Sequence, residues 1–364
     1  MTIIIFLVIL AVLVFVHELG HFIAAKLFGI RVDEFAIGFP PKIWSWKKGE
    51  TKYALNAIPF GGYVKIFGED PNEENTNGAD STRSFVHASA WKQILVLLSG
   101  IFFNIIFAWI LISISFNIGT LTSVNSEYSG KLTNAGVIIL SVEKDSPAMK
   151  AGLAEGDFIS GITLGKENIK NPTIEQIQSL IGKATSSVQL NYKRGLSENT
   201  VDVIPANGLV NGRKAIGVAM DFAGTLKFGF FQSFYEGAKL TVLEVKAVTV
   251  GMYKFFENAF VGDKSMLSQV SGPIGIAGMV GEARQFGVAY LFGFIALISI
   301  NLAVLNAIPF PALDGGRVLF ILLEKIFRRK IKPAIMNWTN GIGFMLLMAL
   351  MVFITYKDIL KLFK

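Results

Sequence analysis

The segment His17-Glu18-Leu19-Gly20-His21 brings two imidazoles and one carboxylate together within a single short stretch of the chain. In an α-helix, residues four apart lie on one face, so both histidines can bind one metal ion. This spacing favours zinc, and a glutamate beside the ligands can accept a proton from a metal-bound water. We therefore predict one zinc ion bound by His17 and His21, with Glu18 as the general base.

The motif lies inside an apolar run, at residues 3–28, that is long enough to cross a membrane. Burying three ionisable side chains in a membrane helix is costly, so they require a functional explanation. The alternative is that His17 and His21 only pack against another helix. That alternative leaves unexplained why two of the chain's three histidines fall at ligand spacing around a glutamate.

Two histidines leave a catalytic zinc site incomplete, because such sites generally have three protein ligands. The chain has no cysteine, and the remaining histidine, His87, lies in a polar loop where a solvated side chain is the simpler interpretation. Asp314 is the better candidate, because Pro309 and Pro311 break the helix just before it and its depth in the membrane matches that of His17. The alternative is that Asp314 caps the following helix.

The composition indicates a polytopic membrane protein. The chain has 364 residues, of which 52% are hydrophobic, and the basic residues behind its net charge of +7 do not form a nucleic-acid patch. The mean hydropathy is +0.52. We expect about four transmembrane helices, at residues 3–28, 93–118, 289–308 and, as a short last span, 341–356. The first run has no basic n-region and is not expected to be a cleaved signal peptide.

Basic residues gather in the loop at 31–92 and after the third span, so the positive-inside rule places both on the cytoplasmic side. The first loop reads as a small cytoplasmic β-hairpin or sheet element, with strand candidates at 31–39, 42–46, 51–58 and 63–67 and a turn at Pro59-Phe60-Gly61-Gly62. This loop belongs to the first membrane half, residues 1–120.

Residues 121–222 have the composition of a soluble domain and would lie outside. Their run Ser146-Pro-Ala148, Ala151-Gly152-Leu153 and Gly156-Asp157 resembles the PDZ domain, an α+β fold. Residues 223–288 form a connector. Within it, residues 232–256 have apolar side chains at helical spacing, which favours an interfacial amphipathic helix over a fifth span. Residues 289–364 form the second membrane half.

Several of these motifs together resemble the site-2 protease family of intramembrane metalloproteases. They are His17–His21, Gly61-Gly62-Tyr63-Val64-Lys65, Gly100 with Asn104, Ser271-Gly272-Pro273-Ile274-Gly275, and Asn306 to Gly316 with Pro309, Pro311 and Asp314. The resemblance implies zinc ligation by His17, His21 and Asp314, with Glu18 as general base. It also implies that Asn306, Gly62 and Tyr63 contact the substrate or stabilise the oxyanion. Alternatively, Asn306 satisfies the broken helix backbone, and Asn104 is a polar contact between spans.

The resemblance further implies regulated intramembrane proteolysis in the bacterial cytoplasmic membrane. The expected substrates are single-span membrane proteins, such as anti-sigma factors already trimmed by a site-1-type protease, or remnant signal peptides. The nearest type is the regulator of sigma-E protease (RseP) group, whose better-known members carry two PDZ domains where this chain has room for one. A catalytically silent membrane PDZ adaptor and a metal transporter are the alternatives.

Overall fold

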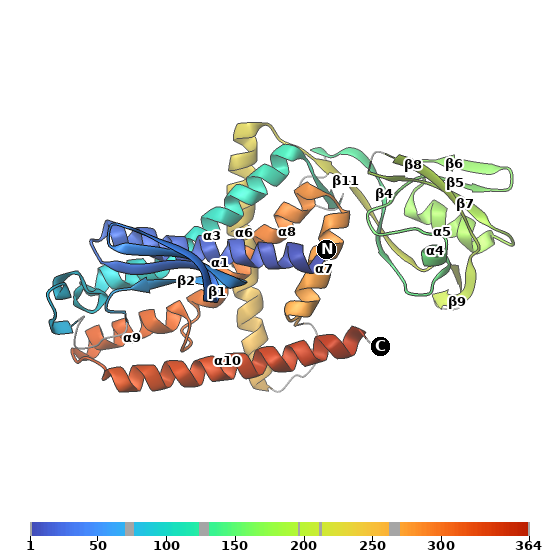
Figure 1. The fold of residues 1–364 in the computed structure, drawn as a ribbon. Helices are drawn as coiled ribbons and strands as arrows, with labels where there is room; N and C mark the ends of the chain where they lie inside the picture. The colour runs from blue at the N-terminus through green and yellow to red at the C-terminus, as the bar shows by residue number, and fades with distance from the viewer. Residues whose placement is uncertain are drawn as a thin grey trace. The chain divides into compact units, whose positions relative to one another are not determined.

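The computed structural model describes residues 2–69, 76–123, 131–195, 197–210, 213–261 and 270–362. The chain divides into two compact units (Figure 1). The first unit comprises Met1–Ile112, Gly237–Val280 and Phe294–Lys364, and the second comprises Ser113–Glu236 and Gly281–Gly293. The proposed chemistry belongs entirely to the first unit.

Four helices among the described residues are long and apolar enough to cross a membrane, as the sequence predicts. They are α1 (Thr2–Leu27), α3 (Ala90–Ile118), α8 (Val288–Ala307) and α10 (Pro333–Leu362). The expected bounds of the last span, 341–356, are too short. Proline is tolerated at the first position of a helix, and polar residues such as Asn337 and Asn340 weaken the apolar signal of the first turns without ending the helix.

Small residues allow α1 and α3 to pack closely. A Cβ atom at Gly20 would lie 2.5 Å from the carbonyl oxygen of Ser99, so no larger residue fits there without a shift. Close approach at small residues is a common way for membrane helices to associate. On another side of α3, the Ser299 hydroxyl of α8 donates a hydrogen bond of 2.8 Å to the carbonyl of Asn104. Thus α3 holds α1 and α8 in fixed registers.

The loop between α1 and α3 forms a small antiparallel sheet beside α1 (Figure 1). Its two long strands, β1 (Val32–Lys48) and β2 (Thr51–Ile66), are both bent. Residues 51–55 pair with 44–48 on one side and with 34–37 on the other, and 34–37 also pair with 62–65. The four strand segments predicted from the sequence are therefore confirmed, and Gly61 takes a φ of 132° at the expected turn.

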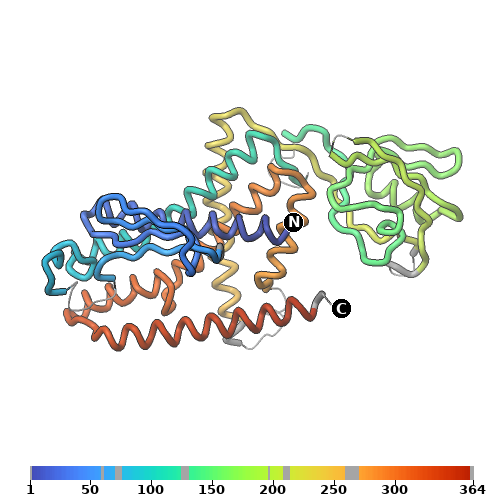
Figure 2. Tube along the Cα trace, viewed as in Figure 1, coloured from blue at the N-terminus to red at the C-terminus, as the bar shows by residue number. Residues whose placement is uncertain are grey.

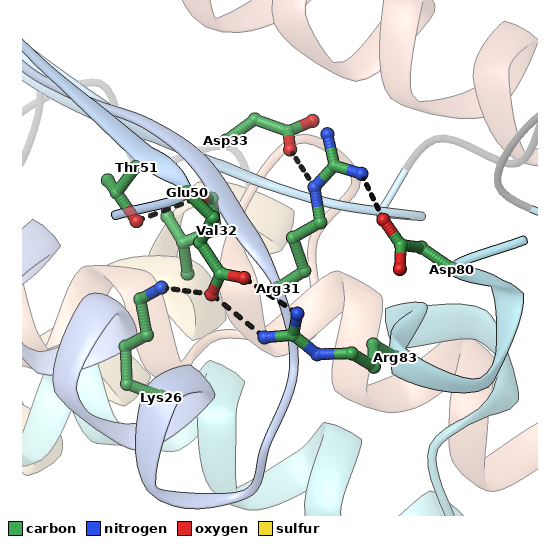
Figure 3. Close-up of polar contacts among 8 residues, drawn as sticks. All are labelled: Lys26, Arg31, Val32, Asp33, Glu50, Thr51, Asp80 and Arg83. Atoms are coloured by element: carbon green, nitrogen blue, oxygen red, sulfur yellow. Dashed lines mark hydrogen bonds and ion pairs between the residues drawn. The ribbon is translucent and has the colours of Figure 1, made fainter. Parts of the chain in front are cut away.

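Ion pairs join this sheet to the end of α1 and to the 3-10 turn η1 (Ser81–Arg83), as Figure 3 shows. Glu50, in the turn between β1 and β2, accepts hydrogen bonds from Lys26 and from both terminal nitrogens of Arg83. Arg31 bridges Asp33 and Asp80. These contacts fix the sheet at its base, and a second 3-10 turn, η2 (Phe85–His87), leads into α3.

Two further helices of the first unit are α9 (Asp314–Phe327) and α7 (Pro273–Gln285), of which α7 continues into the second unit. Asp358 of α10 is buried, and its Oδ2 accepts the backbone N–H groups of Gly272 and Gly275 at 2.8 and 2.9 Å. A carboxylate from another helix thus caps the start of α7. Helix α6 (Phe230–Val261) is not among the four candidate spans, and its expected position at the membrane surface stays a prediction.

The second unit, most of which is drawn in green to yellow in Figure 2, is built on one antiparallel sheet. Its strand order is β3-β11-β4-β5-β7-β8, with β6 paired to β5. Asp157 is fully buried, where it accepts hydrogen bonds from the N–H of Ala154 at 2.9 Å and from Nε and Nη2 of Arg194 at 2.7 Å. Ser146 caps α4 by accepting the N–H of Met149. The residues that carry the PDZ resemblance therefore hold turns and helix ends in this unit.

The bounds of its elements follow the chain order. They are β3 (Thr120–Ser123), β4 (Thr133–Val142), α4 (Pro147–Lys150), β5 (Phe158–Leu164), β6 (Glu167–Lys170), α5 (Ile174–Lys183), β7 (Val188–Arg194), β8 (Ser197–Val203), β9 (Ala206–Val210), β10 (Arg213–Ala215) and β11 (Val218–Leu226).

Glu50 gives a test of the base of the sheet. Hydrogen bonds from Arg83 and Lys26 lower its pKa from the ordinary 4.5 to about 2. Because the folded-state pKa lies below the unfolded one, the stabilisation is complete above pH 4.5 and is lost as the pH falls toward 2. Glu50→Gln should lower the free energy of unfolding by about 1–2 kcal/mol at neutral pH. It should also make the midpoint of thermal unfolding in detergent depend less on pH below pH 4.5.

Glu198→Gln is the matched control, because it removes an exposed ion pair with Lys193 and should leave the unfolding midpoint unchanged. If the unfolding midpoint of Glu50→Gln falls as steeply with decreasing pH as that of the wild type, Glu50 does not stabilise the sheet through these ion pairs.

Candidate metal centre

Two histidines of α1 and the first residue of α9 converge in the structure. The ligand atoms of His17, His21 and Asp314 all lie within 4.8 Å of one another. Asp314 Oδ2 lies 3.0 Å from His17 Nε2 and 3.4 Å from His21 Nε2, and the two Nε2 atoms are 3.2 Å apart. Although it is this close to two nitrogens, the buried Oδ2 makes no hydrogen bond of acceptable geometry. Three electron-pair donors facing one point fit a bound cation.

The second nitrogen of each imidazole is also accounted for. His21 Nδ1 lies 2.8 Å from the carbonyl oxygen of Val96, so it carries the proton and leaves Nε2 free for a metal. His17 Nδ1 faces the side-chain amide of Asn104, 3.3 Å from Nδ2, while the amide oxygen is buried without a partner. Amide nitrogen and oxygen are assigned by their hydrogen bonds. With the amide nitrogen and oxygen of Asn104 exchanged, the oxygen accepts a hydrogen bond from the protonated Nδ1 of His17, which leaves Nε2 of His17 free to bind a metal. We therefore assign that orientation of the amide.

Gly100 of α3 lies directly against the two imidazoles. A Cβ atom there would be 2.6 Å from His21 Nε2 and 2.8 Å from His17 Cε1. These distances are shorter than van der Waals contact, and both rings are already fixed from behind. The absence of a side chain at Gly100 therefore creates the space that the ligand atoms occupy.

Asp314 is brought to the histidines by the chain reversal after α8. Ala312 takes a φ of 73° in the turn, and carbonyls of Ala307 and Phe310 pack so closely on Gly315 and Gly316 that neither accommodates a Cβ atom. The N-cap of α9 is Leu313, without a side-chain cap. The structure therefore gives no support to the interpretation of Asp314 as a helix cap.

Glu18 points from α1 toward the sheet. Its Oε2 accepts the backbone N–H of Val64 at 3.0 Å. Since backbone groups alternate along a strand, Val64 and Gly62 present their N–H and C=O groups to the outer edge, away from 34–37. The edge strand of the sheet therefore borders the residue that the sequence predicts to be the general base.

The other predicted site residues are placed differently. Tyr63 donates its hydroxyl to Glu34 at 3.2 Å, so its side chain is engaged within the sheet. Asn306 is half-buried in the last turn of α8, and its side chain makes no hydrogen bond to the described part of the chain. His87 is exposed on η2, where Nδ1 bonds to the carbonyl of Ser81, and it is not part of the metal-ligand group.

The chain is similar to known proteins over nearly its whole length. The model of the family described as "Peptidase family M50" matches residues 5–350. A Clostridium perfringens protein named "Putative zinc metalloprotease" is 36% identical over 349 residues, covering 96% of this chain and 95% of the relative. A Nostoc protein of the same descriptive name is 33% identical, covering 96% and 93%. The "Regulator of sigma-W protease RasP" of Bacillus subtilis is 28% identical, covering 100% and 99%.

The space at Gly100 can be tested with one methyl group. Gly100→Ala should lower zinc affinity at least about tenfold, because the Cβ atom displaces two ligands. Gly341→Ala is the control, because a Cβ atom at this helical position in α10 meets nothing within 4 Å. Zinc content after dialysis against a graded chelator series measures the effect. Equal zinc retention by both variants would show that Gly100 does not shape the site.

Asn104 gives a second test, based on the hydrogen-bond acceptor that it presents to His17. Asn104→Leu should weaken zinc binding about 10- to 100-fold, because removal of such an outer partner has this cost in metal sites. Asn104→Asp keeps an acceptor at the same position and should restore most of the affinity. The comparison is made by zinc competition with a chromophoric chelator. If the leucine variant binds zinc as tightly as the aspartate variant, Asn104 does not orient His17.

Proposed function

The chain belongs to peptidase family M50, and from that premise we propose that it is an intramembrane zinc endopeptidase that cleaves single-span membrane proteins. Membership makes it a zinc-dependent protease, a hydrolase of peptide bonds. The observation that carries the proposal is the convergence of His17, His21 and Asp314 beside Glu18, within a unit that contains apolar membrane-spanning helices.

The depth of the site supports cleavage within the bilayer. His17 lies about 22 Å along α1 from its start at Thr2, in a hydrocarbon core of about 30 Å. Helix α1 is long and apolar enough to cross a membrane. We expect the site in the cytoplasmic third, with the N-terminus and the PDZ-like region outside, because the basic loops flank this end of the helices.

In the proposed mechanism, His17, His21 and Asp314 hold the zinc, which when bound supplies Lewis-acid polarisation and an acidified water. Glu18 accepts a proton from the attacking water and returns it to the leaving amine of the peptide. The N–H of Val64 holds the carboxylate of Glu18 toward this task through Oε2, which leaves Oε1 to take the proton. Asn306, as a half-buried amide one turn before the chain reversal, is proposed to donate to the developing oxyanion.

The edge of the sheet is the proposed binding place for the substrate. A transmembrane helix must unwind before its peptide bonds become accessible, and an unwound segment exposes unpaired N–H and C=O groups. The outward-facing N–H and C=O of Gly62 and the C=O of Val64 can pair with these groups by strand addition, while the N–H of Val64 stays bonded to Glu18. Gly62 fits this role because it has no side chain, whereas Tyr63 contributes through its bond to Glu34 inside the sheet.

We propose that the substrates resemble anti-sigma factors, first trimmed outside by a site-1-type protease, or remnant signal peptides. The name of the Bacillus subtilis relative, a regulator of sigma-W protease, supports this class. The second unit would act as a PDZ domain on the outer side of the bacterial cytoplasmic membrane. We expect it to screen out substrates whose external parts are still bulky.

A catalytically silent adaptor is the principal alternative, since the PDZ-like region alone could capture other proteins. The complete set of His17, His21, Asp314 and Glu18 argues against it, because an adaptor gains nothing from buried metal ligands. A transporter would need ionisable groups along a path, whereas here they meet at one point.

A pair of isosteric substitutions separates binding of the metal from catalysis. Glu18→Gln should keep zinc and abolish cleavage, a loss of at least about a thousandfold, because an amide cannot accept the proton. Asp314→Asn should lose cleavage together with zinc, because it removes the anionic ligand. Zinc content and cleavage of a reconstituted single-span substrate are measured on the same samples. Near-wild-type cleavage by Glu18→Gln, or full zinc in Asp314→Asn, would contradict the respective role.

A further inference from the structure

A basic pocket lies in the first unit, toward the opposite end of α9 from Asp314. It has a volume of about 250 Å³ between the start of α3 and the end of α9. One wall is formed by Ala88, Ala90 and Gln93, and the other by Ile321 and Glu324. Four cationic side chains complete the lining: Lys325, Arg328, Arg329 and Lys330.

The positive charge of this pocket is only partly neutralised. Glu324 bonds through Oε2 to Lys330 at 3.0 Å and through Oε1 to the backbone N–H of Ile331 at 2.9 Å. Within the described ranges, Lys325, Arg328 and Arg329 have no carboxylate partner at ion-pair distance. Arg328 takes a left-handed conformation with φ 50° at the end of α9, which turns the chain and keeps the basic run beside the helix. The pocket is therefore lined by three cationic side chains that no carboxylate of the described residues neutralises, so it is suited to bind an anion.

Large apolar side chains next to the pocket indicate that it opens at a membrane surface. Ile326 and Phe327 precede Arg328 and are 71% and 69% exposed, and Trp91, next to Ala90, is 55% exposed. Tryptophan and cationic residues together mark the interface between hydrocarbon and headgroups. In water, exposing these large apolar side chains would have a free-energy cost, which contact with lipid acyl chains removes.

We propose that this pocket binds the phosphate of an anionic phospholipid headgroup. The guanidinium groups of Arg328 and Arg329 suit a phosphate because they donate two parallel hydrogen bonds, and Lys325 adds a point charge. The neighbouring Ile326, Phe327 and Trp91 provide an apolar surface for the acyl chains, which a soluble phosphate would not use. Since α9 runs about 20 Å from Asp314 to this pocket, the bound lipid fixes the far end of the helix that carries the third candidate zinc ligand.

The test uses the full chain purified in detergent and native mass spectrometry of retained lipid. Phosphatidylglycerol and phosphatidylcholine with identical acyl chains are offered in equal amounts. The wild type should retain phosphatidylglycerol at least about tenfold over phosphatidylcholine, since each interfacial cation contributes about fivefold. Lys325→Gln with Arg329→Gln should lower this preference by about tenfold or more. Lys47→Gln with Lys48→Gln removes the same charge from exposed positions of β1 and should leave the preference unchanged.

Inorganic phosphate in large excess forms the second arm and should displace little of the retained lipid, because it cannot use the apolar surface. Displacement of all retained phosphatidylglycerol by phosphate would overturn the assignment in favour of a soluble anion. Equal retention of the two lipids by the wild type would overturn the proposal, because the protein would then not distinguish an anionic headgroup. An equal loss of preference in the control variant would overturn it in favour of general surface charge. Lipid retention needs neither zinc nor proteolysis, so its failure would leave the proposed protease intact.

Discussion

Three electron-pair donors, held within 4.8 Å of one another among apolar helices, are the constraint on which the rest of the structure depends. Without a cation, His17 Nε2, His21 Nε2 and Asp314 Oδ2 would be buried polar atoms at a net cost. A metal ion converts that cost into binding, because the carboxylate is neutralised and each lone pair is used. The fold must therefore bring two distant segments, α1 and the start of α9, to the same depth.

Helix α3 makes this convergence possible without supplying a ligand. It contacts α1 at Gly20 and α8 through the hydrogen bond from Ser299. Both helices that lead to the site are therefore positioned by packing against α3. From the same helix, the carbonyl of Val96 fixes one imidazole, the amide of Asn104 faces the other, and Gly100 leaves the space between them. The sheet then approaches from the opposite direction and holds Glu18 by a backbone N–H.

The sequence alone predicts the parts of this arrangement that depend on local pattern. The i,i+4 spacing indicates that His17 and His21 share a helix face, and β-branched and aromatic residues between turn signals predict the strand segments of the sheet. Asp314 is a candidate because the chain has no cysteine and one other histidine, and because it follows Pro309 and Pro311 at a depth that matches His17. The start of α10 was misplaced because its first turns are polar, although Pro333 is a permitted first residue.

What the sequence could not reveal are contacts that depend on which faces meet. The sequence singles out Gly100 and Asn104 only through the family resemblance, and their contacts with the two imidazoles appear only once α1 is packed against α3. The bond between Glu18 and Val64 joins a side chain to a backbone group 46 positions away, and backbone groups have no signature in the sequence. Their roles follow from packing, which is decided by the whole unit rather than by any one segment.

The most direct measurement is X-ray absorption spectroscopy at the zinc edge of the purified protein loaded with one zinc ion. The arrangement of His17, His21 and Asp314 predicts two imidazole nitrogens at about 2.0–2.1 Å and carboxylate oxygen at about 2.0–2.2 Å, with room for one water. It also predicts that Asp314→Ala, but not His87→Ala, changes this shell. A spectrum with three imidazoles that loses one of them in His87→Ala would contradict the account.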